Sequence, residues 1–470
     1  MLRQLFRTKY ITSDIENDHG LKRCLSAWDL AFLGIGAIIG TGIFVLTGIA
    51  AATQAGPAIV ISFIIAGIAC AFAALSYAEL SAAVGGCGSA YGYSYAAFGE
   101  LCAFIIGWDL LLEYGISVAA VANGWAGYFN NALTAIGLPL PDMLTKAPKL
   151  GGFINLPAAV IILMLMILLI MGVKHSAKAN KAMVFVKLIT ILIFIVVAVF
   201  NVHPENWQPF MPFGWFQVLP DGKTTGILAG ASLVFFAYVG FDAVSTATAE
   251  AQNPQRDLPF GIITSLTFCT VIYIIVSGLL TGVVPYTELN VSSPVAHALK
   301  QIGFNAASAL IATGVIAGLT TVMLVLYYAL TRIIFAMSVD GLFSPFFSQV
   351  NPQTQTPIRV IILCGIIMAM VAGFVPLGDL AELVNIGTLA AFVLVCLGVI
   401  VLRITKPDMP RPFRTPFSPL FPLLGMLLCG ALMAFLPALT WLRFLIWLII
   451  GLIVYFTYSI HQSKLADEVS

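Results

Sequence analysis

Charged residues are scarce in this chain of 470 residues. They make up 9% of the sequence, against roughly 25% in an ordinary soluble domain, while hydrophobic residues make up 60%. This composition excludes a soluble globular protein and predicts one that is embedded in the lipid bilayer. The formal net charge of +1 provides no strongly basic surface, so we expect no nucleic-acid partner.

Cysteine and histidine are few and scattered, and their scarcity excludes further classes of function. None of the eight cysteines lies in a predicted outer loop or a CxxC motif, so we expect neither a disulfide framework nor a metal site. The five histidines show no triad or metal-ligand spacing, so we expect no enzyme and no cofactor. The N-terminal residues are polar and charged, so we expect no cleavable signal peptide.

Long apolar runs, by contrast, are abundant. Runs such as "LPAAVIILMLMILLIMGV" (156–173) approach the length of about 20 residues that a helix needs to cross a bilayer. They lack the alternation of barrel strands. The sequence therefore predicts an all-α membrane protein with twelve transmembrane helices. These spans lie near residues 28–52, 57–83, 98–130, 156–173, 182–201, 226–249, 260–284, 304–337, 358–376, 381–402, 417–437 and 441–460.

The charges between these spans predict the orientation of the chain. With the N-terminus placed in the cytoplasm, most of the lysines and arginines lie on that side, as the positive-inside rule requires. We therefore expect a cytoplasmic N-terminal segment (1–27) and a cytoplasmic tail (461–470). The lysines and arginines on the outer side are Lys146, Lys149, Lys223, Lys300 and Arg443.

Glycine interrupts two of the predicted helices at corresponding positions. "GIGAIIGTGIF" (34–44) lies in the first span and "FFAYVGFDAVS" (235–245) in the sixth. Glycine costs about 1 kcal/mol in a helix interior, and paired interruptions indicate an inverted-repeat transporter with its site near the membrane midplane. The repeats would be 28–201 and 226–402, with two further helices in 417–460. The alternative is that these glycines only let helices pack closely.

A broken helix offers backbone groups to a ligand. The half before the break exposes carbonyl groups, which suit an ammonium group, and the half after it exposes N–H groups, which suit a carboxylate. A free α-amino acid carries both charges on one carbon. Two facing breaks can therefore bind the zwitterion while neighbouring helices contact its side chain.

The interrupted segments also carry a resemblance to a known family. Together with "NPQRDLP" (253–259), "GWDLLLEYG" (107–115), "FMPFG" (210–214) and "IGTLAAF" (386–392), they resemble the amino acid, polyamine and organocation (APC) superfamily. Within it they are most similar to bacterial relatives of the cationic amino acid transporters. The resemblance implies amino acid transport in a bacterial cytoplasmic (inner) membrane. It also implies a five-helix inverted repeat (5+5) plus two helices, with helices one and six unwound at the midplane.

The same resemblance implies a substrate site made mainly of backbone groups. The N–H groups for the substrate carboxylate belong to Gly40, Thr41 and Gly42. The carbonyl groups for the amine belong to Ile38, Phe236, Ala237 and Val239. Phe236 would also act as an outer lid over the substrate.

Two side chains bear on the choice of substrate. Glu113 on span three occupies the position where relatives that accept arginine or lysine place a carboxylate. Asp109, four residues earlier, shares its helix face, and we expect a structural role for it. Leu326 on span eight is apolar and fairly bulky, which favours small or apolar amino acids, with cationic ones still possible.

Lys187 lies within the predicted fifth span, in "FVKLITILIFIVV". Burial disfavours the charged form of an amine, so a lysine at this depth can exchange a proton near neutral pH. The resemblance implies that it reaches between spans one and eight and couples transport to protons without sodium. The alternative is that its long stem extends to the inner interface, about 9 Å away near Lys181.

These observations favour a proton-coupled amino acid importer that works by alternating access. Its partners would be the amino acid, the proton and the bilayer, with the oligomeric state left open. A first alternative is an amino acid exchanger that needs no proton gradient. A channel or a membrane sensor is a further alternative, but the sequence shows neither a ring of like residues nor a soluble signalling domain.

Overall fold

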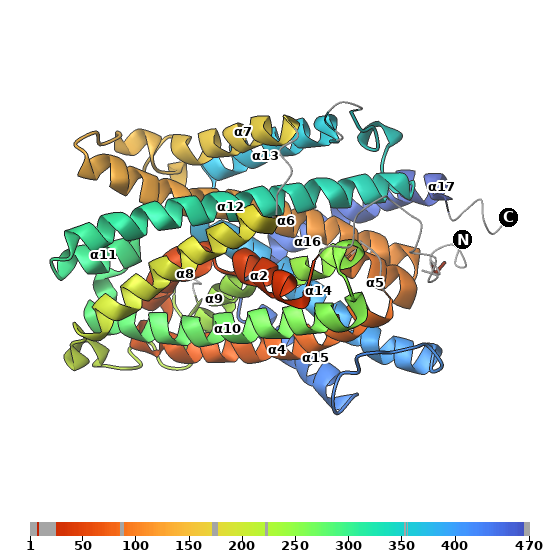
Figure 1. Cartoon of the computed structure of the whole chain (residues 1–470), viewed down its shortest axis with the longest axis horizontal. Coiled ribbons are helices and arrows are strands. Elements are labelled where there is room, and N and C mark those ends of the chain that lie inside the picture. Colours follow the sequence, from red (N-terminus) through yellow and green to blue (C-terminus); the bar gives the residue numbers. More distant parts are fainter. Residues whose placement is uncertain are drawn as a thin grey trace.

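The protein folds as a bundle of helices that run along the long axis of the molecule (Figure 1). Eight helical stretches in the described chain are long and apolar enough to cross a membrane, and three shorter apolar helices accompany them. The prediction of a multi-pass helical membrane protein is therefore confirmed. The predicted terminal segments 1–27 and 461–470 lie largely outside the described residues. This computed structural model describes residues 7–8, 25–84, 89–171, 177–220, 224–351, 354 and 356–464.

Uninterrupted helices form the body of the bundle. They are α4 (Ile59–Ala83), α6 (Glu100–Ala135), α7 (Leu156–Ile170), α8 (Ala177–Val199), α10 (Pro254–Val283), α12 (Asn305–Val339), α13 (Ile358–Phe374), α14 (Leu377–Thr405), α15 (Leu420–Ala434) and α16 (Ala438–Val454). Two stretches are interrupted. The first comprises α2 (Ala27–Ile38), η2 (Gly42–Leu46), α3 (Thr47–Ala50) and η3 (Ala51–Ala55). The second comprises α9 (Ile227–Val234), η8 (Phe235–Tyr238) and η9 (Asp242–Glu250).

Some elements lie outside the predicted spans. They are α5 (Ser89–Ala97), α11 (Pro294–Gln301) and a two-residue antiparallel ladder of β1 (Gln217–Val218) and β2 (Thr224–Thr225). The ladder is a small departure from the predicted all-α class. Helix α11 covers the first interrupted stretch so closely that a Cβ atom on Gly48 would lie 2.4 Å from Cβ of Pro294.

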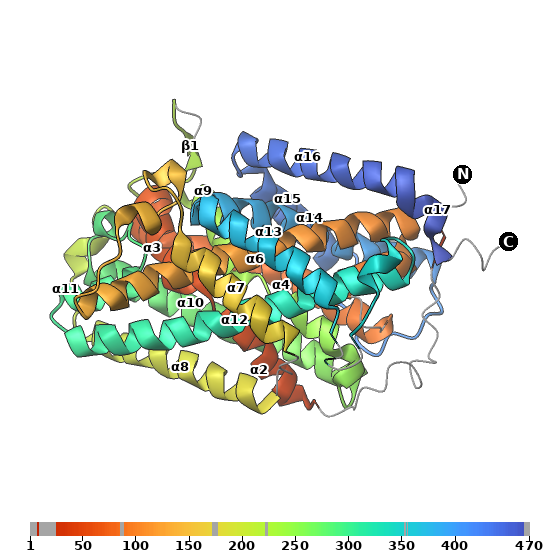
Figure 2. The same ribbon diagram turned by 90° about the horizontal axis from the view of Figure 1, so that it is seen from above.

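Two groups of closely packed helices form the centre of the bundle. Helix α10 packs along α4 and α2, whereas α6 packs along α12 and α14. Small residues allow the close approach, as is common between membrane helices. A Cβ atom on Gly67 of α4 would lie 2.9 Å from Thr270 of α10, and one on Gly261 of α10 would lie 2.9 Å from Leu30 of α2. Helix α16 lies at the edge of the bundle (Figure 2).

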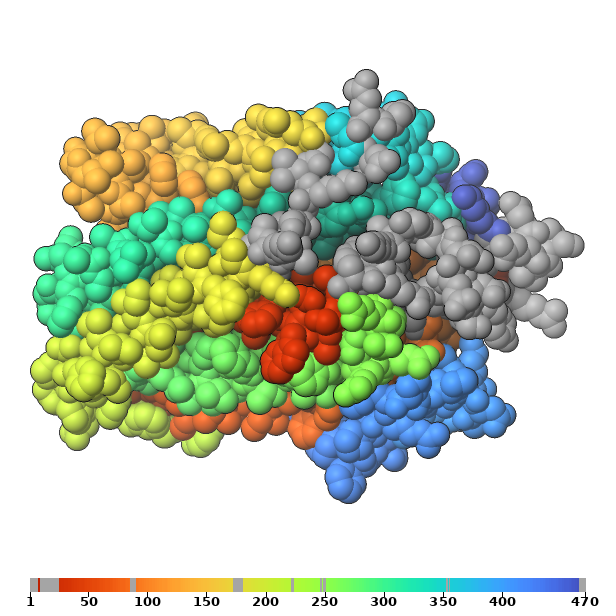
Figure 3. All heavy atoms as spheres, in the orientation of Figure 1, coloured from red at the N-terminus to blue at the C-terminus, as the bar shows by residue number. Residues whose placement is uncertain are grey.

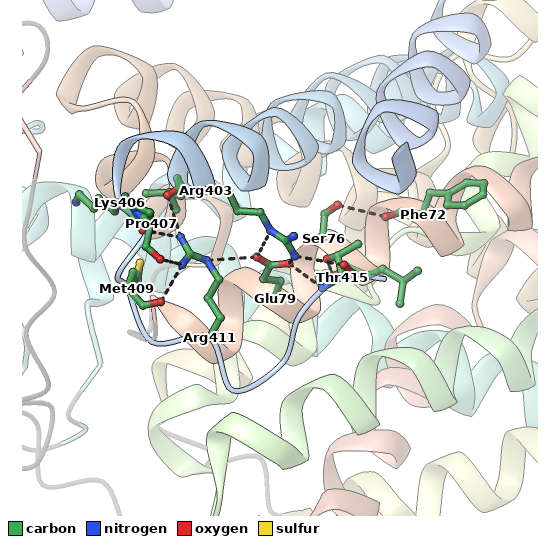
Figure 4. Close-up of polar contacts among 11 residues, drawn as sticks. Phe72, Ser76, Glu79, Arg403, Lys406, Pro407, Met409, Arg411 and Thr415 are labelled. Carbon is green, nitrogen blue, oxygen red and sulfur yellow. Dashed lines mark hydrogen bonds and ion pairs between the residues drawn. The ribbon is translucent and has the colours of Figure 1, made fainter. Parts of the chain in front are cut away.

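A buried ion pair connects the two groups near one end of α4. The Glu79 side chain is 2% exposed and accepts hydrogen bonds from Nε and Nη2 of Arg403 at 3.0 and 2.7 Å. It also accepts from the Thr415 backbone N–H at 2.7 Å, and Nε of Arg411 lies 3.5 Å away. Figure 4 shows the carboxylate between the two guanidinium groups. The pair therefore fastens α4 to the connection between α14 and α15.

We expect Glu79→Gln to lower the free energy of unfolding by about 3 kcal/mol, because two guanidinium groups lose their counter-charge in a mostly buried position. Thermal unfolding in detergent measures the effect. The control is Lys146→Gln, which breaks the exposed Lys146–Asp142 pair and should change the free energy by less than about 1 kcal/mol. Equal unfolding temperatures for the two variants would show that the buried pair does not stabilise the fold.

Candidate functional site

The first interruption leaves carbonyl groups without helical partners. Helix α2 ends at Ile38, because Ile39 is extended (φ −72°, ψ 99°), and the backbone is helical again from Thr41. The last carbonyls of α2 must therefore find other donors. The Gly36 carbonyl accepts from Nζ of Lys187 at 2.6 Å, and the Ile38 carbonyl accepts from the Tyr273 hydroxyl at 2.9 Å.

The second interruption has a similar form. Helix α9 gives way to the 3₁₀ turn η8, which ends at an extended Val239 (φ −58°, ψ 133°). Gly240 follows with φ +111°, a conformation that glycine adopts without strain. At the end of α9, Nδ2 of Asn385 donates to the carbonyls of Ser232 and Leu233 at 2.7 and 3.0 Å.

The two interruptions touch, and glycine makes the contact possible. A Cβ atom on Gly42 would lie 2.3 Å from Cα of Ala237, and one on Gly240 would lie 3.1 Å from the carbonyl oxygen of Ala37. The Tyr273 hydroxyl, from α10, lies 2.9 Å from the carbonyl oxygens of both Ala237 and Ile38, so the two share its single proton. One hydroxyl therefore bridges both broken helices.

A small cavity lies beside this contact. Its lining residues are Ala37, Ile38, Gly40, Thr41, Gly42, Ser117, Val121, Phe236, Val239, Val322 and Leu326. Its free volume is about 10 Å³, on the order of one water molecule. An amino acid can therefore occupy it only when the surrounding helices move apart.

The structure brings most of the predicted substrate residues to this cavity. Those that line it are Ile38, Gly40, Thr41, Gly42, Phe236, Val239 and Leu326. Ala237 lies behind the wall against Gly42. Glu113 is not among the lining residues; it precedes Ser117 by one turn of α6, and its Oε1 is buried with no hydrogen-bond partner in the described chain. Lys187 contacts α2 outside the cavity.

Sequence reasoning missed several residues at the site. They are Ala37, Ser117, Val121, Tyr273 and Val322. Ser117 could have been predicted from the sequence. It lies four residues after Glu113, on the helix face that Asp109 and Glu113 share. Nothing in the sequence distinguishes Tyr273 from the other tyrosines of the chain.

Two hydroxyl groups at the cavity have no partner. Thr41 Oγ1 and Ser117 Oγ are buried without a hydrogen bond among the described residues. About one turn before Ser117 on α6, the Tyr114 hydroxyl donates to Oδ2 of Asp242 at 2.8 Å. A buried polar atom without a partner is costly, so these hydroxyls suit a ligand that brings its own polar groups. No cluster of metal-ligating side chains occurs in the described part of the chain.

Comparison with known proteins adds family-level information. A sequence model of the family described as "Amino acid permease" matches residues 25–458. The chain is 50% identical to the methylthioribose transporter of Bacillus subtilis (strain 168) over 465 residues, which are 98% of this chain and 99% of that protein. It is 50% identical to the branched-chain amino acid permease BcaP of the same organism over 469 residues, again 98% and 99%. It is 38% identical to the vacuolar cationic amino acid transporter 4 of Arabidopsis thaliana over 419 residues, 87% and 68%.

We expect Tyr273→Phe to loosen both interruptions at once, because the carbonyls of Ile38 and Ala237 lose their shared donor. Hydrogen exchange should increase in both 34–44 and 235–245, and the free energy of unfolding should fall by about 1–3 kcal/mol. The control is Tyr238→Phe, which removes the bond to the Phe63 carbonyl and should leave exchange in 34–44 unchanged. Exchange that rises in only one of the two segments would contradict the bridging role.

Proposed function

Because the chain belongs to the amino acid permease family, we propose that it imports amino acids across a bacterial cytoplasmic membrane by alternating access. The observation that carries this proposal is the cavity between two broken helices that touch. The helix ends beside it carry backbone N–H and carbonyl groups. A zwitterion is the ligand that uses both.

The proposed topology has twelve membrane crossings. Residues 28–201 and 226–402 would form two inverted repeats, and 417–460 the last two helices. The corresponding breaks in α2 and after α9 support this arrangement, and we place both at the membrane midplane. The distribution of lysines and arginines supports cytoplasmic termini.

The proposed binding mode uses the backbone groups at the two breaks. The substrate carboxylate would accept from the N–H groups of Gly40, Thr41 and Gly42 at the start of the resumed helix. Since Tyr273 already donates to the carbonyls of Ile38 and Ala237, the ammonium group must share these with the hydroxyl. The carbonyls of Phe236 and Val239 complete the proposed amine site.

The remaining wall favours a small or branched apolar side chain. Val121, Val322 and Leu326 line the cavity, and contact between apolar groups stabilises such a ligand. Glu113 lies one helical turn from Ser117 and would be reached only by a long cationic side chain. We therefore propose apolar amino acids as the main substrates and cationic ones as weaker substrates.

Lys187 is the proposed coupling residue. Its side chain is 1% exposed, and its amine donates to the end of α2 rather than extending to the membrane interface. Loss of the proton from this amine would weaken its bond to the Gly36 carbonyl, since charged donors make the stronger bonds. The state of the proton would thereby influence the position of α2, which is one wall of the cavity.

A thioether-bearing sugar is a second candidate substrate. One relative of 50% identity is named as a methylthioribose transporter. The unpartnered hydroxyls of Thr41 and Ser117 could form hydrogen bonds with sugar hydroxyls. This substrate has no ammonium or carboxylate group, so it would leave the proposed zwitterion contacts unused.

The first test is uptake of labelled leucine into sodium-free proteoliposomes under an inward proton gradient. We expect accumulation above equilibrium that collapses with the gradient, with strong competition by unlabelled alanine and weak competition by arginine. Accumulation of labelled methylthioribose without uptake of leucine would identify the sugar as the substrate. Rapid counterflow without accumulation would identify an exchanger.

We expect Lys187→Ala to abolish accumulation on a pH gradient and to retain counterflow of leucine at equal pH. The reason is that the variant lacks the exchangeable proton but keeps every residue that lines the cavity. The control is Lys181→Ala, which removes the ion pair to Asp29 at the partly exposed end of α8 and should still accumulate substrate. Accumulation by Lys187→Ala would refute the coupling role.

A further inference from the structure

Two glycines of α12 lie directly under side chains of α8. A Cβ atom on Gly314 would lie 2.1 Å from Oγ1 of Thr190, and one on Gly318 would lie 2.9 Å from Cγ of Lys187 and 3.1 Å from its Cε. Helix α8 packs on both α12 and α2, and Figure 3 shows it, in yellow, beside α2, in red. Each glycine therefore makes room for one side chain of α8.

The stem of Lys187 passes over Gly318 on its way to α2. Its Nζ donates to the Gly36 carbonyl at 2.6 Å. Toward the other end of the interface, Lys181 pairs with Asp29 of α2. The buried Cys269 thiol of α10 is a titratable group near the Lys187 amine. The amine thus crosses from α8 to α2 along a groove in α12.

A methyl group at Gly318 would fill this groove. Carbon atoms in contact prefer about 3.5–4.0 Å, so a distance of 2.9 Å forces the stem to move. Cγ is close to the root of the side chain, and its displacement carries the rest of the stem with it. A shift of about 1 Å would stretch the bond to Gly36 beyond the range of hydrogen bonds.

We propose that Gly318 is a positioning residue for Lys187. Because Gly318 has no side chain, the lysine stem can pass close to α12 and its amine can reach the Gly36 carbonyl at the end of α2. Gly318 is not among the residues that line the cavity, so it acts on coupling and not on substrate contact. The inference rests on the proposed role of Lys187 and adds a second residue, on a different helix, to the coupling device.

The experiment compares Gly318→Ala with Gly314→Ala in sodium-free proteoliposomes, with labelled leucine as the probe. Both variants exchange glycine for alanine on the same helix, and alanine is the better helix former. We expect Gly318→Ala to lose about tenfold in accumulation on a proton gradient, the size of one hydrogen bond to a charged group. It should keep counterflow at equal pH. Gly314→Ala places its methyl group 2.1 Å from Oγ1 of Thr190. It should therefore lower accumulation and counterflow together, because it displaces α8 and not the lysine stem alone.

Three outcomes would overturn the inference. They are normal accumulation by Gly318→Ala, loss of its counterflow together with its accumulation, and selective loss of accumulation by Gly314→Ala with counterflow kept. The second would assign Gly318 to the general fold, and the third would assign the effect to packing of α8. Lys187→Ala, run alongside, separates this test from the proposed function. If that variant still accumulates leucine, the coupling role itself fails, whatever the glycine variants do.

Discussion

Inside a bilayer, every backbone N–H and carbonyl group must find a partner within the protein, and the two broken helices make this requirement hard to meet. The chain meets it with side chains from other helices. Tyr273 of α10 donates to both breaks, Lys187 of α8 donates to the end of α2, and Asn385 of α14 donates to the end of α9. The breaks are therefore held in place by α8, α10 and α14, whereas the walls of the cavity outside the breaks come from α6 and α12.

Close packing is the second condition for this arrangement. Gly42 and Gly240 bring the two breaks into contact, and Gly124 of α6 leaves room for the Thr41 side chain, which would lie 2.6 Å from a Cβ atom there. In a membrane, packing and polar contacts replace the hydrophobic effect as the force between helices. Glycine in this protein thus has two roles. It permits the backbone conformation at a break, and it allows neighbouring helices to approach closely.

Much of the architecture could be predicted from the sequence, because apolar length and glycine interruptions are local signals. The membrane class and the resemblance to the family are confirmed, and the backbone residues expected at the site, such as Gly40 and Val239, line one cavity. The side-chain partners could not be predicted. Glu79 pairs with Arg403, which lies more than 300 residues away in the sequence, and Tyr273 is one tyrosine among 14. Such pairings depend on how helices rotate about their axes, which hydropathy does not encode.

The ion pair at Glu79 also has a mechanical consequence for α4. That end of the helix is fastened to the connection between α14 and α15. If α4 tilts, it therefore pivots about the Glu79 carboxylate. The segment of α4 from Glu79 to Ile59 is about 30 Å long at 1.5 Å per residue. A tilt of about 10° therefore carries the far end through about 5 Å, roughly one helical turn, while the fastened end stays in place. Helices that pack along α4 would move with it, and their displacement would be largest near Ile59, at the end farthest from Glu79.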